Sequence, residues 1–483
     1  MPTLTFNTPW FFLFFAAVYL IYLALPRRKQ NYVLLAASYL FYASWDWRFV
    51  GLIAFSTILD YGIGLKLHQT DNRRYRQAWL ICSVAINLGV LGFFKYVGFF
   101  AANLQHLAAT VGLTLSLPVL HIILPVGISF YTFQTISYTI DIYRHRLNAT
   151  RNLADFALFV AFFPQLVAGP IERASRLLPQ IAANRRLTDS RITHGTYLIL
   201  WGLFKKIVVA DTLAELVDPV FAAPPPYRAA AVLMALYAFA WQIYSDFSGY
   251  TDIARGISKL MGFELMLNFD TPYLAANPQE FWRRWHISLS SWLRDYVYIP
   301  LGGSRYGRLA TVRNLFTTIV LGGLWHGAAW TFMAWGTYHG LLLLLHRLLQ
   351  PVLRRSDAIT HTVWKQRVWL GVRIGIFFHL TLGGWLLFRA ESLRQAFVML
   401  ASLEHGLQAQ PADLRSALFG VALILPVAAM HIKQWHSGDR LILAKLPLLN
   451  RLLYTAALLI ITLFVTQSGN APETARAFIY FQF

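Results

Sequence analysis

The chain of 483 residues carries charged side chains at only 13% of its positions, against about 25% in soluble globular proteins, and 57% of its residues are hydrophobic. Its formal net charge is +20, but the basic residues stand in short clusters between long uncharged runs, which excludes the soluble basic domains of a nucleic-acid-binding protein. A single cysteine, Cys82, excludes disulfide frameworks and zinc knuckles. We therefore expect a multi-pass membrane protein with no nucleic-acid partner.

Uncharged runs of the length that crosses a bilayer, about 20 residues, recur along the whole chain. They cover 1–26, 30–45, 77–94, 96–140, 156–171, 229–245, 314–346, 374–388, 416–432 and 452–472. These runs predict an all-α membrane protein with about 11 transmembrane helices and one or two re-entrant segments. We expect residues 1–483 to form a single multi-pass membrane domain.

Two of these runs are too long for a single crossing. The run 96–140 has 45 residues, about 68 Å as one helix, and Gly112, Pro118 and Pro125 are expected to break it. The run 314–346 has 33 residues, about 50 Å as one helix. Its glycines offer several places where the chain can turn or pack closely: Gly322, Gly323, Gly327, Gly336 and Gly340.

The basic clusters predict the orientation of the first helix. Residues 1–10 carry no charge and the cluster Arg27-Arg28-Lys29 follows the apolar run, which is the reverse of a cleavable signal peptide. The positive-inside rule then places the N-terminus outside and both this cluster and the next one, Lys66 to Arg76, in the cytoplasm.

The segment 254–313 is the least membrane-like part of the chain, with eight basic side chains and four acidic ones. Its centre, FWRRWH at 281–286, has a polar face and an aromatic face. Such a pattern is typical of a helix that lies among lipid headgroups. We therefore expect 254–313 to be mostly interfacial, in contact with membrane lipid and facing the cytoplasm.

Common catalytic motifs are missing from the chain. It has no Walker A loop, no Rossmann glycine-rich turn, no HExxH and no GxSxG. Their absence argues against ATP-driven transport, nicotinamide chemistry and zinc proteolysis. We expect no bound cofactor and no metal site.

His326 is the first candidate for catalysis, because it lies deep in the uncharged run 314–346, in the sequence GGLWHG at 322–327. An ionisable side chain in such a run costs free energy and is a functional hypothesis by default. Histidine is also well suited to exchanging a proton near neutral pH. An equally weighted interpretation is a neutral histidine that bonds a backbone carbonyl between helices.

His286 is the second candidate, beside Arg283, Arg284 and Trp285. Guanidinium groups pair with phosphate in a bidentate way, so the two arginines could hold a phosphate-bearing ligand at the membrane surface. Attraction to anionic lipid headgroups explains each arginine equally well. By itself, a histidine in this position is more often a structural hydrogen-bonding group.

Asp246 and Asp252 lie in the sequence YSDFSGYTD at 244–252, which ends the run that begins at residue 229. Two carboxylates at the end of a span can orient a histidine, bind a cation or pair with arginine. Pairing with arginine is the interpretation that the sequence favours, because buried charges need partners.

Seven sequence blocks follow one another between residues 120 and 340: PVGISFY at 125–131, FPQLVAGPIER at 163–173, DFSGYTD at 246–252, WRRWHIS at 282–288, WLRDY at 292–296, PLGG at 300–303 and LWHG at 324–327. Together they resemble the signature of the membrane-bound O-acyltransferase family. Within it, the chain is most similar to bacterial membrane subunits that O-acetylate polysaccharides such as alginate. Gln134 departs from that group, where glutamate is expected.

The resemblance implies a fold of about 11 transmembrane helices and re-entrant segments around a central tunnel, in the bacterial inner membrane. It implies that His326 corresponds to the catalytic histidine of the family and His286 to its second signature histidine. Candidates for binding the donor or lining the tunnel are Arg283, Arg284, Trp285, Arg294, Trp325, Asp246 and Asp252.

The implied reaction moves an acetyl group from a cytoplasmic thioester, acetyl-CoA or an acyl carrier protein, to an exported polysaccharide. The implied partners are a periplasmic acetyltransferase of the SGNH-hydrolase type and the machinery that makes and exports the polymer. Other readings stay open: transfer of D-alanyl or another acyl group from a carrier protein, a non-catalytic transporter that uses Asp246, Asp252 and the histidines as an ion path, or a scaffold. The concentration of His, Trp and Arg in 281–326 favours the enzyme.

Overall fold

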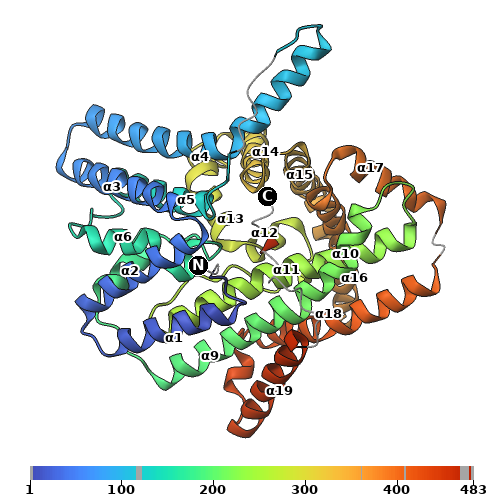
Figure 1. Cartoon of the computed structure of the whole chain (residues 1–483). Coiled ribbons are helices and arrows are strands. Elements are labelled where there is room, and N and C mark those ends of the chain that lie inside the picture. The colour runs from blue at the N-terminus through green and yellow to red at the C-terminus, as the bar shows by residue number, and fades with distance from the viewer. Residues whose placement is uncertain (1–3, 116–121, 360–361, 407–408, 468–477, 480–483) are drawn as a thin grey trace. The chain divides into compact units, whose positions relative to one another are not determined.

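The computed structural model describes residues 4–115, 122–359, 362–406, 409–467 and 478–479, and within these ranges all regular secondary structure is helical (Figure 1). The predicted all-α class is therefore confirmed. Five of the described helices are long and apolar enough to cross a membrane, so the chain is a multi-pass membrane protein. They are α3 (Arg48–Gln69), α4 (Arg73–Thr110), α16 (Val363–Arg389), α18 (Pro411–Ser437) and α19 (Leu448–Gln467). The expected total of about 11 spans stays a prediction.

The chain divides into two compact units. Unit 1 comprises residues 1–199 and 253–266, and unit 2 comprises residues 200–252 and 267–483. Two helices, α9 (Asp189–Leu203) and α11 (Ala229–Leu260), contribute residues to both units. A single membrane domain over the whole chain stays a prediction.

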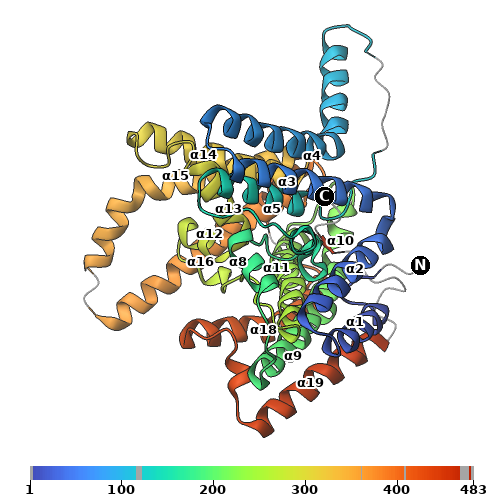
Figure 2. The same ribbon diagram turned by 90° about the vertical axis from the view of Figure 1, so that its left-hand side faces the viewer.

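Unit 1 consists of helices from the first part of the chain. Besides α3, α4 and part of α9 they are α1 (Pro9–Leu23), α2 (Arg27–Asp46), α5 (Ile128–Tyr143), α6 (Leu153–Ala161), α7 (Phe163–Leu166) and α8 (Ala174–Ala182). Helices α1 and α2 lie side by side (Figure 2), and α2 and α3 both pack against α6. The break expected within 96–140 is confirmed, because α4 ends at Thr110 and α5 begins at Ile128. Gly112 follows the end of α4 with φ +78°, which glycine adopts at no steric cost. Pro118 lies outside the described residues.

Unit 2 begins with two helical pieces that precede α11. They are the π-helix η1 (Phe204–Asp211) and α10 (Thr212–Ala222). Short elements then follow one another: η2 (Pro272–Leu274), α12 (Pro278–Arg284), α13 (Ile287–Leu293) and the π-helix η3 (Arg294–Tyr298). The remainder consists of α14 (Gly307–His326), α15 (Trp330–Ile359), α16, α17 (Leu393–Ser402), η4 (Leu403–His405), α18, η5 (Ile442–Lys445) and α19.

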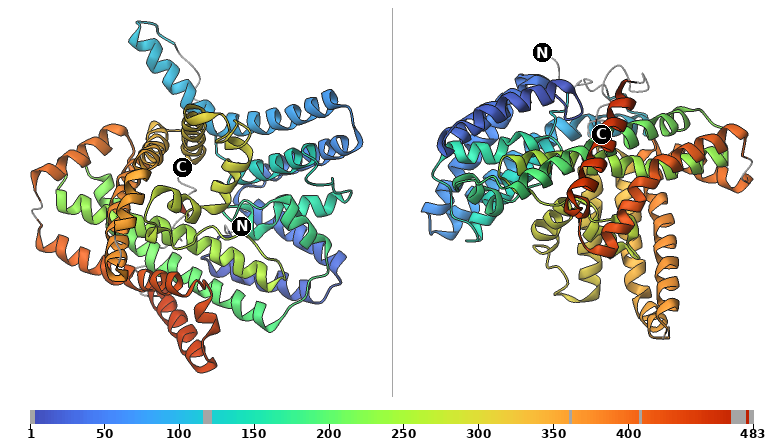
Figure 3. Two further views of the ribbon diagram at one scale, coloured as in Figure 1. Left: turned by 180° about the vertical axis from the view of Figure 1, so that it is seen from behind. Right: turned by 90° about the horizontal axis from the view of Figure 1, so that it is seen from below.

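Helices α14 and α15 form a closely packed hairpin, and α15 also packs against α16 (Figure 3). The turn falls at Gly327, one of the expected positions. Two other glycines of the run bring the helix backbones together: a Cβ on Gly323 would lie 2.3 Å from the carbonyl oxygen of Phe332, and one on Gly336 would lie 2.9 Å from that of Ile319. The glycines of this run thus serve both predicted purposes, turning and close packing.

Candidate active site

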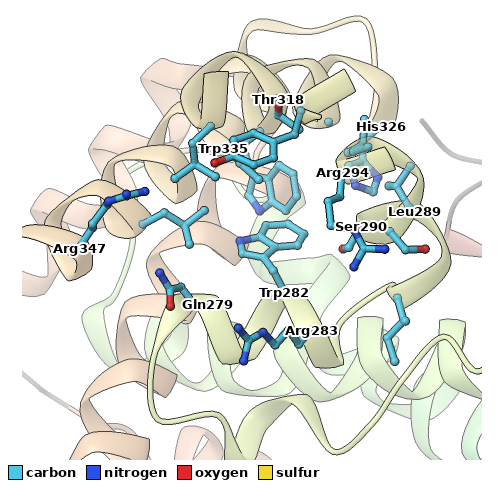
Figure 4. Close-up of a pocket in the computed structure, with 18 residues that line it drawn as sticks. Gln279, Trp282, Arg283, Leu289, Ser290, Arg294, Thr318, His326, Trp335 and Arg347 are labelled. Carbon is cyan, nitrogen blue, oxygen red and sulfur yellow. The ribbon is translucent and has the colours of Figure 1, made fainter. Parts of the chain in front are cut away.

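A pocket of about 500 Å³ lies within unit 2, where α12, α13, η3, α14 and α15 line it (Figure 4). Its lining contains three arginines, Arg283, Arg294 and Arg347, and no aspartate or glutamate. The other lining residues are Gln279, Trp282, Ile287, Leu289, Ser290, Ser291, Leu293, Tyr298, Leu315, Thr318, Ile319, Gly322, His326, Trp335 and Leu343. A mostly apolar pocket whose charged lining residues are all positive favours an anionic ligand that also has an apolar part.

Two indole rings occupy the middle of the pocket wall. The ring centroids of Trp282 and Trp335 are 5.7 Å apart and the rings are nearly perpendicular, at 77°. Figure 4 shows both indoles between Arg347 on one side and His326 on the other. The pocket therefore offers an apolar wall that leads from cationic groups to an imidazole.

His326 is the last residue of α14 and is 4% exposed, yet it lines the pocket. The Trp335 ring stands edge-on to the imidazole at 5.0 Å, and the Phe388 ring lies 5.3 Å away. The helix ends directly after it at Gly327, where any Cβ would lie 2.1 Å from the Phe332 ring. The aromatic packing thus holds the imidazole at the pocket wall.

His286 lies behind the pocket wall and is absent from its lining. Its ring centroid is 6.2 Å from that of His326 and 5.7 Å from that of Trp325, and the Phe247 ring stands edge-on at 4.7 Å. The side chain is 1% exposed, in the segment between α12 and α13 and outside the five candidate spans. Burial lowers its pKa from 6.5 to about 3, so the ring is neutral at physiological pH.

The interfacial helix expected around 281–286 is only partly present. The side chain of Asn277 caps α12 by accepting from the Glu280 N–H at 2.9 Å, but the helix ends at Arg284. Trp285 then turns to an extended conformation, and His286 has φ +42° in the left-handed region. The expectation of one continuous amphipathic helix is therefore wrong at its C-terminal end.

Backbone hydrogen bonds to residues 268–270 hold this turn in place. The Ile287 N–H donates to the Asn268 carbonyl oxygen, and the Asp270 N–H donates to the Arg284 carbonyl oxygen, both at 2.9 Å. The Ser288 N–H also donates to the Asn268 side chain, at 3.3 Å. Because these bonds fix both sides of the turn, they offset the cost of the left-handed conformation at His286.

The arginines predicted to bind a phosphate-bearing donor occupy different environments. Arg283 and Arg294 line the pocket, and Arg294 also pairs with Asp295 at 2.8 Å. Arg284 is outside the lining, because its guanidinium donates to Glu280 at 2.6 Å and to the Thr271 hydroxyl at 2.9 Å. A role for Arg284 in binding a donor stays a prediction.

Asp246 and Asp252 lie away from the pocket lining and pair with lysines of η1. Asp246 is 2.5 Å from the Lys206 Nζ, and its other oxygen accepts from the Ile479 N–H at 2.9 Å. Asp252 is 2.7 Å from the Lys205 Nζ. For Asp246, lysine takes the place of the expected arginine, and Asp252 also has a lysine partner. The two adjacent lysines, in a largely apolar stretch, are a sequence signal that could have identified these partners.

Two tryptophans that the sequence offers as site candidates lie outside the pocket lining, and two other residues lie in it. Trp285 and Trp325 are buried at 1% and 4% exposure and are not among the lining residues, although Trp325 packs against both His286 and His326. Trp335 and Arg347 line the pocket but were not predicted. Arg347 is the first charged residue after the uncharged run 314–346, which was the available signal. No sequence pattern distinguished Trp335 from other aromatic residues.

Comparison with known proteins identifies the family of this sequence. The sequence profile of the membrane-bound O-acyltransferase family matches residues 146–384. The chain is 45% identical to the "Probable alginate O-acetylase AlgI" of Azotobacter vinelandii, over 81% of this chain and 76% of that protein. The protein of the same name from Pseudomonas aeruginosa is 44% identical, over 83% and 75% of the two chains. The "Peptidoglycan O-acetyltransferase" of Helicobacter pylori is 37% identical, over 83% and 80%.

The pocket of unit 2, with His326 and its arginines, lies in the chain segment that the family profile covers. The relatives match over more than three quarters of this chain. The protein is a member of the membrane-bound O-acyltransferase family and hence an O-acyltransferase.

Proposed function

We propose that the protein transfers an acetyl group from acetyl-CoA to a hydroxyl acceptor, as a step in the O-acetylation of an exported polysaccharide such as alginate. The observation that carries this proposal is the placement of His326 on the wall of a pocket that also holds Arg283, Arg294 and Arg347. The names of its relatives, which specify alginate or peptidoglycan O-acetylation, support the acetyl group and the class of polymer.

The charge of the pocket supports a phosphate-bearing donor. Arg283 and Arg347 make no ion pair with any residue in the described part of the chain, so their guanidinium groups can pair with phosphate oxygens. The indoles of Trp282 and Trp335 can pack against the apolar pantetheine arm. Such contacts would position the thioester near His326, and positioning of two reactants accounts for much of the rate of an acyl transfer.

His326 acts as the general base in this proposal. Its imidazole takes the proton of the acceptor hydroxyl while the oxygen attacks the thioester carbonyl carbon. The tetrahedral intermediate then expels the thiolate, the C–S bond breaks, and the proton passes from the imidazole to the sulfur. The products are the acetyl ester and free CoA, so atoms and charge balance without a cofactor. His286, neutral and buried behind the site, would keep the surroundings of His326 free of a second charge.

The proposed reaction takes its donor and its acceptor from opposite sides of the membrane. The donor enters from the cytoplasm, the acceptor lies on the periplasmic side of the inner membrane, and the N-terminus is periplasmic. The acceptor is the serine of an SGNH-type acetyltransferase, which passes the acetyl group to the polymer. The clusters Arg27-Arg28-Lys29 and Lys66 to Arg76 support this orientation through the positive-inside rule.

A test in cells compares His326→Ala with His346→Ala. His346 lies on the same hairpin, is half-buried and is absent from the pocket lining, so it is a matched control. We expect His326→Ala to reach the membrane at the normal level and to abolish acetylation of the polysaccharide, whereas His346→Ala retains it. Wild-type acetylation by a normally inserted His326→Ala protein would contradict the mechanism. Loss in both variants would assign the effect to the hairpin rather than to the imidazole.

A further inference from the structure

A second cavity, of about 710 Å³, lies within unit 1 and far along the sequence from the residues of the candidate active site. Helices α2, α3 and α6 and the turn before α6 line it, and these three helices pack against one another (Figure 1). Its apolar wall includes Leu35, Ala54 and Ile58, and its rim includes Tyr32, Tyr61 and Arg151. Neither the pocket of unit 2 nor the acyl transfer uses any of these residues.

The cavity opens on the outer surface of this helix group. Ile58 and Tyr32 both line the cavity, and they are 63% and 58% exposed. Because α3 is a candidate membrane span, exposed apolar side chains on it face lipid rather than water. The cavity is therefore accessible from the bilayer.

The two ends of the cavity differ in polarity. Arg151, Asn152 and the tyrosines Tyr32 and Tyr61 lie at one end, where the Tyr61 hydroxyl donates to the Arg151 carbonyl oxygen at 2.7 Å. The other end, towards Ala54, is mainly apolar apart from Thr57 and Tyr39. From Tyr32 to Tyr39 along α2 is about 10 Å, which accommodates the upper part of an acyl chain. Tyrosine at such a boundary is typical of the headgroup level of a membrane.

The polar end of the cavity carries a positive charge, Arg151, that has no ion-pair partner among the described residues. Arg151 is exposed, and its guanidinium forms no hydrogen bond or ion pair with a residue in the described ranges. The basic start of α2, with Arg27, and the basic end of α3, with Lys66, flank the same end of the two helices. An anionic headgroup at this end would meet several cations, whereas a zwitterionic one would bring its own positive charge to them.

We propose that this cavity, bounded by α2, α3 and α6, is a binding site for one anionic phospholipid. The phosphate pairs with Arg151, the tyrosines contact the glycerol region, and one acyl chain lies along Leu35, Ala54 and Ile58. The positive-inside rule places the basic end, and hence the lipid, in the cytoplasmic leaflet. The proposal does not depend on the proposed function, because it concerns different residues in a different unit.

Native mass spectrometry of the purified full chain tests the proposal, with dioleoyl-phosphatidylglycerol and dioleoyl-phosphatidylcholine titrated separately. We expect one phosphatidylglycerol to bind at least about five-fold more tightly than phosphatidylcholine, since one basic residue near a membrane surface contributes about 1 kcal/mol. Arg151→Ala should lower this preference about five-fold, which is the contribution expected of one basic residue. Arg146→Ala, which removes the same charge from the same turn but outside the cavity, should keep it.

A second pair of variants tests the acyl-chain end. Ala54→Leu fills the cavity and should weaken binding of both lipids, whereas Ala36→Leu, at an exposed position of α2 outside the lining, should not. Equal affinity of the wild-type chain for the two lipids would overturn the proposal. So would an equal effect of Arg146→Ala and Arg151→Ala, or unchanged lipid binding in Ala54→Leu.

Discussion

Two groups of charged residues in unit 2 differ in whether their charges are paired. In the first group, Lys206 lies 2.9 Å from Asp211 and 2.5 Å from Asp246, with nearly all of these side chains removed from solvent. In the second, Arg283 and Arg347 line a pocket and make no ion pair with any described residue. Removal of one partner from a buried ion pair destabilises the fold, whereas a cation on a pocket wall that has no ion-pair partner is available to a ligand. The distinction separates the framework of the unit from its candidate site.

Removal of one partner from the paired group should have the largest effect. Asp246→Ala removes one of the two carboxylates that pair with the Lys206 ammonium, and it also removes the acceptor of the Ile479 N–H. We expect the loss of about 3–5 kcal/mol of stability, as is usual for breaking a buried ion pair. The thermal midpoint of the purified protein and its level in the membrane measure this.

Asp46→Ala is the matched control, because Asp46 pairs with the well-exposed Arg48. It should leave the thermal midpoint almost unchanged. If Asp246→Ala were as stable as this control while acetylation fell, the carboxylate would belong to the site, and the contrast between the two groups would fail.

Removal of a pocket arginine should instead weaken the binding of the acetyl donor. For Arg283→Ala and Arg347→Ala we expect the KM for acetyl-CoA to rise about 10- to 100-fold each, because a hydrogen bond to a charged group is worth about 1.5–3 kcal/mol. The kcat and the thermal midpoint should change little. Steady-state kinetics of the purified protein measures these values.

Arg305→Ala provides the control for charge alone, since Arg305 is exposed and lies outside the lining. It should keep the wild-type KM. An equal rise of KM in all three variants would attribute the effect to net charge and not to the pocket.

A smaller effect on stability and KM is expected from a substitution between α14 and α15, the two helices of the hairpin that lines part of the pocket. Gly336→Ala brings a Cβ within 3.0 Å of the α14 backbone, so the helices must move apart. We expect a loss of about 1–3 kcal/mol of stability, the usual cost of overpacking, together with a higher KM. Gly371→Ala, where nothing lies within 4 Å, should be neutral or stabilising by up to about 1 kcal/mol. Equal thermal midpoints in the two variants would show that the close approach is not required.

The smallest effect concerns the pH dependence of stability. Below pH 6.5 the unfolded chain gains a proton on His286, but the folded chain does not until about pH 3. The contribution of this residue to stability is therefore fully present above pH 6.5 and falls as the pH decreases towards 3. Between pH 7 and pH 5.5 we expect His286→Asn to reduce the decline in stability by about 1 kcal/mol.

Asparagine suits this test because it tolerates the left-handed conformation of His286. His145 also has a positive φ but is exposed, so His145→Asn is the control and should leave the pH dependence unchanged. A decline in His286→Asn as steep as in the wild type would contradict the neutral state of the buried ring.

Much of the fold could be predicted from the sequence because it follows from local patterns. Long uncharged runs predict membrane helices, and glycine at a position such as Gly327 predicts a turn, as observed. The end of α12 could not be predicted, because its cause is not local: Asn268, sixteen residues before Arg284, supplies the hydrogen bonds that hold the turn at His286.

The candidate site was predictable only in part for the same reason. His326, Arg283 and Arg294 stood out by residue type, and the structure brings all three to one pocket. The role of Trp335 depends on the approach of α15 to α14, which no spacing in the sequence reports. The lysine partners of Asp246 and Asp252 were not predicted, because the choice between lysine and arginine depends on which helix packs beside the two carboxylates.

The central claim, that the pocket of unit 2 binds the donor and that His326 performs the transfer there, is tested most directly by separating binding from turnover. Purified His326→Ala protein in nanodiscs is given labelled acetyl-CoA, and its Kd and acetyl transfer are both measured. We expect a Kd within about two-fold of the wild type and turnover lower by about 10²–10⁴, the usual contribution of a general base. Turnover near the wild-type rate would contradict the account.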